Sequence, residues 1–377
     1  EALPDGPGRR ALVARACREL AQLDEQTDPA AALALLRRGL AAVAGDRELE
    51  AELLVAEGTT LIFSDDYDEA DAALSRALEL LGPGPSPLRA GALMSRSTVS
   101  AYRGDAGAAE AAALAALEVA TALGDELLTA RILANLGLDQ LYAGRWPEAA
   151  ASLARALALS ERLGDERARA GILLNLGLCA LYRGEQDRAE EHLLASRELA
   201  ERLELAEFAT DALDALGELY TRLGRYAEAA AALDAAEATI AATGNAEQRP
   251  NLLARRAALL LAMGAPAAAL ATADEALALL DADDDPVLRA IFLRARGQAR
   301  RAAGLGEQGQ ADLEGSLALL GDDEPYERAR TAAALGAALA AGGEAARGEA
   351  LLREARATFA HLGAAYDLLR LSTAEAP

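Results

Sequence analysis

Residues 133–165, LANLGLDQLYAGRWPEAAASLARALALSERLGD, decide the fold because their pattern recurs along the chain. The triplet Asn135-Leu136-Gly137 returns 40 residues later as Asn175-Leu176-Gly177, and after another 40 as Ala215-Leu216-Gly217. We call the third residue of the triplet the anchor, and its nine copies are Leu20, Gly58, Ser97, Gly137, Gly177, Gly217, Ala257, Gly297 and Gly336. A spacing of 38 to 40 residues indicates an array of repeated units.

Other positions keep a fixed distance from the anchor. Seven residues after it most repeats have a glycine, such as Gly144 or Gly184, which is typical of a helix end. Twelve and nineteen residues after it come small side chains, such as Ala149 and Ala156, with Leu153 between them. Two helices approach closely only where facing side chains are short, so each unit is predicted to be a tightly packed helical hairpin.

This pattern, with Trp146, Tyr226 or Tyr67 two residues after the glycine position, resembles the tetratricopeptide repeat over nearly the whole chain. The usual unit has about 34 residues. Here it has 40, with the extra length in the second helix and its Leu163-Gly164-Asp165 ending. Lengthened repeats of this kind are similar to those of kinesin light chains, bacterial signal-transducing ATPase regulators and CHAT peptidases.

We therefore expect an all-α fold, an alpha-alpha superhelix of about nine helical hairpins with a C-terminal capping helix. In such arrays each repeat contacts only its neighbours. Residues 1–8 are expected to be a flexible tail and residues 9–372 a single array. The repeats are expected at about 9–45, 47–81, 87–124, 126–164, 166–203, 206–244, 247–280, 285–320 and 325–362, with the cap at 364–371.

Composition limits the partners. The net charge of −23 repels phosphate backbones and anionic lipids, so nucleic-acid and membrane binding are not expected. No uninterrupted apolar run is long enough to span a bilayer, and we expect a cytoplasmic protein. All 37 basic residues are arginine, which favours a GC-rich bacterial source. The chain begins at Glu1 without Met, so we also expect it to be part of a longer protein; its oligomeric state stays open.

Two short motifs match ligand-binding patterns but favour structural roles. Residues 304–309, GLGEQG, match a dinucleotide fingerprint, yet that site needs a preceding strand and a helix is expected there. The register places Gly304 in the hairpin turn and Gly309 at a helix crossing. Asp281, Asp283 and Asp285 have calcium-loop spacing, but Pro286 occupies the position of the required glycine, which favours an acidic helix N-terminus.

Neither a metal centre nor a catalytic group is expected. His192 and His361 are the only histidines and lie in different repeats. Cys17 and Cys179 are about four repeats apart, too far for a disulfide, and Cys179 is expected to be a small core residue. We therefore expect no enzyme activity and no cofactor.

Candidate binding residues lie on the first helices of the repeats. By resemblance to tetratricopeptide arrays, these helices line a concave groove, and Asn135 and Asn175 would hold a peptide backbone; an amide that caps or bridges within the array is the alternative. Leu138 and Leu178 follow the anchors directly and join the candidate set. Five residues after the anchors comes an aromatic ladder, which either packs between successive first helices or contacts a ligand: Phe63, Tyr102, Tyr142 and Tyr182.

Charged residues extend the candidate groove in later repeats. Asp211, Asp214 and Glu218 precede Arg222, and Arg294 and Arg301 follow in repeat eight. These residues form acidic and then basic patches of a ligand surface, or else solvated faces without a ligand. Ala134 and Leu174 stand beside the asparagines where chaperone-binding arrays carry basic residues, so binding of chaperone tails is not expected.

Two functions follow from these patterns. The first is a protein-interaction scaffold that binds a peptide or helix of a partner along the concave face of repeats three to six. The alternative is a sensor or regulatory segment of a larger bacterial signalling protein, an ATPase regulator or CHAT-type peptidase, whose catalytic domain lies outside this sequence.

Overall fold

A computed structural model describes residues 7–24, 28–43, 45–280 and 285–374, and these residues contain nineteen α-helices, one short 3-10 helix and no β-strand. The first nine helices are α1 (Pro7–Asp24), α2 (Pro29–Ala42), α3 (Arg47–Ile62), α4 (Tyr67–Leu81), α5 (Pro87–Tyr102), α6 (Ala106–Leu123), α7 (Glu126–Tyr142), α8 (Trp146–Leu163) and α9 (Glu166–Arg183). The others are α10 (Gln186–Arg202), α11 (Ala206–Arg222), α12 (Tyr226–Thr243), α13 (Arg249–Ala262), α14 (Pro266–Ala278), α15 (Pro286–Ala302), α16 (Gly306–Leu319), α17 (Pro325–Ala341), α18 (Ala345–Leu362) and α19 (Ala365–Ala374).

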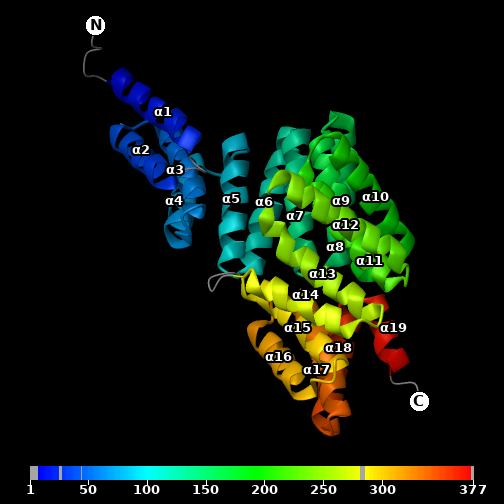
Figure 1. The fold of residues 1–377 in the computed structure, drawn as a ribbon. Helices are drawn as coiled ribbons and strands as arrows, with labels where there is room; N and C mark the ends of the chain where they lie inside the picture. The colour runs from blue at the N-terminus through cyan, green and yellow to red at the C-terminus, as the bar shows by residue number, and fades with distance from the viewer. Residues whose placement is uncertain (1–6, 25–27, 44, 281–284, 375–377) are drawn as a thin grey trace. The chain divides into compact units, whose positions relative to one another are not determined.

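Consecutive helices pack in pairs, which confirms the all-α hairpin fold (Figure 1). Each odd-numbered helix from α1 to α17 is the first of a repeat, and α19 follows the last pair as a cap. Helix α1 begins at Pro7, inside the expected tail, and α19 continues three residues beyond the expected end at 371.

The anchors pack as their small size predicts. A Cβ added to Gly177 would lie 2.6 Å from Leu193 Cγ, and one on Gly137 would lie 2.6 Å from Leu153 Cγ. Both leucines come from the second helix of the same repeat and are fully buried. Each anchor glycine therefore holds a leucine of the paired helix directly against its backbone.

Glycines after the first helices let the chain reverse. Gly144 and Gly184 have φ angles of 72° and 77°, in the left-handed region that only glycine adopts without strain. Two connections depart from this pattern, because Asp65, after α3, and Glu204, after α10, adopt φ angles of 57° and 56° with full side chains.

The chain divides into two compact units, Glu1–Leu136 and Gly137–Pro377, with the boundary inside α7. In unit 1, first helices contact one another along the series α1, α3 and α5. In unit 2 they do so along α9, α11, α13, α15 and α17. First helices thus form one layer within each unit, and this layer carries the candidate binding residues.

Unit 2 departs from the expectation that repeats contact only their neighbours. Trp146 at the start of α8 packs edge-on against Tyr326 of α17, with ring centroids 5.1 Å apart. A Cβ on Gly144 would lie 2.8 Å from Leu362 Cδ2, and α19 contacts α9. Repeat nine and the capping helix therefore close onto repeats four to six, a contact between residues about 180 positions apart that local patterns do not encode.

The structure also accounts for the two short motifs. Gly304 adopts a left-handed φ of 85° in the α15–α16 turn, and a Cβ on Gly309 would lie 2.6 Å from the carbonyl oxygen of Gly297. This glycine-rich stretch follows a helix, as expected. Asp285 caps α15 by accepting a hydrogen bond from the Val287 N–H at 2.8 Å, whereas Asp281 and Asp283 lie outside the described residues.

One described helix, α6, is long and apolar enough to cross a bilayer by length and composition. Its buried side chains Ala109, Ala113, Ala116 and Ala120 lie on one face, and it packs against α5 in the hairpin of repeat three.

Candidate functional site

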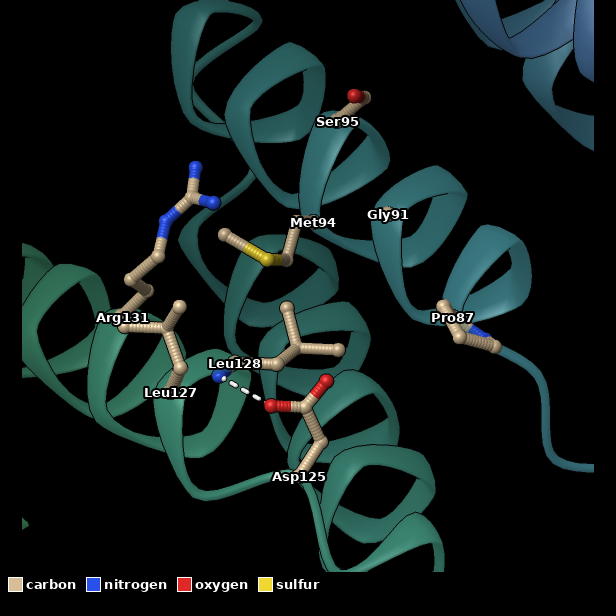
Figure 2. A pocket seen from close by; sticks show the side chains of 8 residues that line it. All are labelled: Pro87, Gly91, Met94, Ser95, Asp125, Leu127, Leu128 and Arg131. Carbon is tan, nitrogen blue, oxygen red and sulfur yellow. Dashed lines mark hydrogen bonds between the residues drawn. The ribbon is translucent and has the colours of Figure 1, made fainter. Parts of the chain in front are cut away.

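The layer of first helices in unit 1 contains a pocket of about 400 Å³ between α5 and the first half of α7 (Figure 2). Met94 projects from α5 toward the side chains of α7, where Leu127 and Leu128 supply further apolar surface. Arg131 stands at the rim. The complete lining is Pro87, Gly91, Met94, Ser95, Asp125, Leu127, Leu128 and Arg131.

The start of α7 is fixed by local chemistry. Gly124 turns the chain with a φ of 68°, and the carboxylate of Asp125 accepts a hydrogen bond from the Leu128 N–H at 2.9 Å (Figure 2). This cap satisfies one of the unpaired N–H groups of the first turn. It also sets the rotation of the helix, and hence the direction in which the following side chains point.

Three exposed residues spaced four apart form a stripe along α7: Leu127, Arg131 and Asn135. Leu127 is 49% exposed. Neither Arg131 nor Asn135 makes a side-chain hydrogen bond or ion pair with any described residue. The stripe thus offers an apolar group, a cation and an amide to a ligand, and the amide does not bridge within the array.

On the α5 side of the pocket, the polar side chain already has a hydrogen-bond partner inside the chain. Ser95 stands in repeat three where Asn135 stands in repeat four, and its hydroxyl lies 3.0 Å from Thr59 Oγ1 of α3. Met94 is half-buried and packs on the core beneath the pocket with Leu128. This wall therefore offers mainly apolar contact.

The layer of first helices in unit 2 instead contains a network of buried charges, which we call the clasp cluster. Its members are Asp214, Glu218 and Arg222 of α11, Arg255 of α13, Arg294 of α15, Tyr326, Glu327 and Arg330 of α17, and Asp367 of α19. Spacings of four residues place Asp214, Glu218 and Arg222 on one face of α11. The other members reach this face from helices that the closure of unit 2 brings to it.

Glu218 is the centre of the cluster. Its side chain is 6% exposed and contacts three guanidinium groups: Arg222 at 2.5 Å, Arg330 at 3.5 Å, and Arg255. Burial alone would raise the pKa of Glu218, but Arg255, Arg222 and Arg330 together hold that pKa well below its usual range. The carboxylate is therefore charged and paired.

Glu327 and Tyr326 link the later helices to this centre. Arg294 and Arg330 both pair with Glu327, and although burial opposes them, they lower its pKa to about 2. The Tyr326 hydroxyl accepts from Arg222 Nη2 at 3.0 Å and donates to Asp367 Oδ2 at 2.9 Å. Burial raises the pKa of Tyr326 to about 12, so this hydroxyl keeps its proton.

Aromatic rings support the cluster from one side. The ring of Tyr326 lies 5.0 Å from Tyr182, 5.1 Å from Trp146 and 6.1 Å from Phe359. Trp146 is 1% exposed. Of the aromatic ladder, Tyr182 alone enters this interior, and the hydroxyl pKa of Tyr182 is raised, first by burial and then by Glu218.

Core packing fails as an explanation for the rest of the ladder. Phe63, Tyr102 and Tyr142 are 48%, 63% and 70% exposed. Tyr102 stacks on Tyr67 of α4 with centroids 5.2 Å apart and an interplanar angle of 11°. Of the four ladder residues, Tyr182 packs among the rings of the unit 2 closure, whereas the other three keep exposed aromatic surface.

The remaining candidates differ in accessibility. Asn175 is half-buried and makes no hydrogen bond with described residues, Leu138 is half-buried, and Leu178 packs against the core of α9 to α13. Asp211 accepts from Gln248 Nε2 at 2.7 Å, and burial with the nearby Asp214 raises the pKa of Asp211 to about 6.

The expected succession of acidic and basic surface patches is wrong for several of its members. Arg255 Nε donates to Asp214 at 3.1 Å, and Arg294 is buried, donating to Thr331 Oγ1 at 3.1 Å. Opposite charges from different repeats therefore meet in the clasp cluster. Arg301 is half-buried outside this cluster, and burial lowers its pKa.

Leu127 and Arg131 of the α5–α7 pocket, and Tyr326 of the clasp cluster, were not among the residues predicted from the sequence. Leu127 and Arg131 could have been found from the four-residue spacing that joins them to Asn135. Tyr326 follows a proline in the first turn of its helix, at a position where other repeats carry no aromatic residue, which is a weaker signal.

Metal-binding and reactive groups are sparse in the described part of the chain. It holds no group of three or more His, Cys, Asp or Glu side chains that could hold a metal ion. Cys17 and Cys179 are both buried free thiols, and burial raises the pKa of Cys179 to about 12.

Together, the paired helices, the anchor contacts and the layer of first helices define a tetratricopeptide-type helical repeat fold. Among solved structures, the chain is similar to the apo form of RapI, with a TM-score of 0.66 and 13% identity over 92% of this chain and 97% of that one. It is also similar to aspartyl phosphate phosphatase F from Bacillus subtilis, with a TM-score of 0.60 and 11% identity over 95% of each chain. At these identities the likeness shows the fold alone. The sequence matches no family model, and no curated protein matches it.

Proposed function

We propose that this chain is a protein-interaction scaffold that binds a peptide segment of a partner in the groove between α5 and α7. The observation that carries the proposal is the stripe of Leu127, Arg131 and Asn135 beside the apolar pocket. Arg131 and Asn135 are exposed and make no contact that holds them inside the chain, so both are free to pair with a ligand. The apolar pocket beside them would at the same time bury an apolar side chain of that ligand.

Each group in the groove fits one part of a peptide. Met94, Leu127 and Leu128 would take an apolar side chain. Asn135 can donate to and accept from a backbone amide at once, which suits an extended segment. Arg131 favours an acidic residue near the apolar one, because opposite charges pair most strongly beside apolar surface. Within unit 2, and separately from this groove, Asn175 is proposed as a candidate backbone contact, and Leu138, Tyr142 and Asp211 as further candidates.

Peptide selection tests the proposal directly. A random peptide library is selected against the full chain, and the Kd of a selected peptide is measured by fluorescence anisotropy. Leu127→Glu, Arg131→Ala and Asn135→Ala are each expected to weaken binding by about tenfold or more, as for the central residues of an interface.

Leu114→Glu is the matched control, because Leu114 of α6 is 45% exposed and lies in unit 1 outside the pocket. Equal losses for Leu114→Glu and Leu127→Glu would remove the groove assignment. Failure to select any peptide would remove the scaffold proposal itself. The regulatory-segment alternative stays a prediction, which the full open reading frame tests.

A further inference from the structure

The last described helix of unit 2, α19, docks against the layer of first helices through specific side-chain contacts. The Tyr366 ring lies beneath the guanidinium of Arg222 at 4.9 Å, and its hydroxyl donates to the Arg222 carbonyl at 3.3 Å. The neighbouring Asp367 accepts from the Tyr326 hydroxyl. Gly184 makes room for this approach, since a Cβ there would lie 3.2 Å from the Tyr366 N atom.

α19 is lightly held apart from these contacts. Among its residues 365–372, none has a fully buried side chain, and Leu369 is 65% exposed. A helix of ten residues is too short to be stable by itself in water. Its order therefore depends on docking against α9 and α18, in which Tyr366 and Asp367 supply the aromatic and acidic contacts to the clasp cluster.

The charges of the clasp cluster balance only when α19 is present. Four guanidinium groups, those of Arg222, Arg255, Arg294 and Arg330, face the carboxylates of Asp214, Glu218 and Glu327. These three carboxylates belong to α11 and α17, and the fourth belongs to Asp367 of α19. A buried site with one surplus cation selects an anionic occupant.

The present occupant leaves part of the site unsatisfied. Arg222 has a side chain only 8% exposed, yet its Nη1 atom has no hydrogen-bond partner among the described residues. The nearest carboxylate oxygen given for it, Asp367 Oδ2, is 3.8 Å away, beyond hydrogen-bonding distance. A buried donor without a partner is costly, so a better-placed carboxylate would bind more favourably.

We propose that Arg222 and its neighbours form a second binding site, for a helical partner segment with an aromatic residue directly followed by an acidic one, and that α19 is its intramolecular occupant. The aromatic ring would cover the Arg222 guanidinium, and the carboxylate would neutralise the surplus charge. The partner segment and α19 compete, so binding releases α19. This site shares no residue with the α5–α7 groove, and either site can fail its test independently of the other.

The test uses the full chain with Tyr366→Ala and Asp367→Asn combined, which removes both contacts from the intramolecular occupant. The probe is a fluorescein-labelled peptide with the sequence of residues 364–374, AAYDLLRLSTA. The double variant is expected to bind it with a Kd at least tenfold smaller than that of the unsubstituted chain. Leu369→Ala, an exposed change on the same helix, is expected to leave the Kd unchanged.

A second arm changes the probe and leaves the protein intact. The same peptide with its Asp replaced by Asn is expected to lose at least tenfold in affinity for the double variant. In the unsubstituted chain, excess mass-labelled peptide is expected to accelerate amide exchange in α19. Absence of peptide binding to the double variant, or equal affinity for all three proteins, would overturn the proposal.

Discussion

Replacing Tyr326 should open the closure of unit 2. Tyr326→Ala removes a ring packed against three other aromatic side chains, and truncating a buried aromatic residue to Ala costs about 3–5 kcal/mol. Tyr326→Phe keeps the ring but removes the hydroxyl that joins Arg222 to Asp367. Hydrogen bonds to charged groups contribute about 1.5–3 kcal/mol, so we expect the Phe variant to lose about 1–3 kcal/mol.

The single tryptophan makes this closure measurable. Trp146 is 1% exposed and lies against Tyr326, so opening should shift its fluorescence emission to longer wavelength. Urea unfolding followed by this signal gives the free-energy changes. Tyr102→Ala is the control, because Tyr102 is 63% exposed and lies in unit 1. If Tyr326→Ala neither shifts the emission nor costs more than Tyr102→Ala, the closure is refuted.

Three further predictions concern stability. Gly177→Ala should lower the free energy of unfolding by about 1–3 kcal/mol in chemical unfolding, because the added Cβ would lie 2.6 Å from Leu193 Cγ. The control is Gly8→Ala, which should cost far less because Gly8 is exposed and has open space around it. Similar losses for the two variants would argue against tight packing at Gly177. Glu204→Gly should stabilise the chain by about 0.5–1 kcal/mol in thermal unfolding, since φ is 56° there, and any destabilisation would count against strain. Glu327 has a pKa lowered from 4.5 to about 2, so its stabilising contribution is complete above pH 4.5 and is lost as pH falls toward 2. Trp146 emission should report this loss in the unsubstituted chain, and Glu327→Gln should flatten it; an unchanged acid profile would contradict the assignment.

The hairpins could be predicted from the sequence because their determinants are local. Gly177 and Leu193 lie sixteen residues apart within one repeat, and the same spacing recurs at Gly137 and Leu153. The left-handed turn at Gly184 follows equally from a fixed distance to the anchor. Such features repeat, and repetition makes them visible in one sequence.

The closure of unit 2 could not be predicted in this way. It depends on small rotations between successive repeats, which add up before Tyr326 meets Trp146. Glu218 and Arg294 consequently appeared as separate surface charges, although Arg330 and Glu327 link them. The repeat position of Asn135 is enough to predict it as a candidate, but only the structure shows that it lies exposed in line with Leu127 and Arg131.

Amide hydrogen exchange on the full chain, with and without a selected peptide, tests the proposed function most directly. We expect protection to be concentrated in residues 87–95 of α5 and 125–135 of α7, and Leu127→Glu to abolish it. Protection confined to the second helices of the repeats, or protection that Leu127→Glu leaves intact, would contradict peptide binding in the α5–α7 groove.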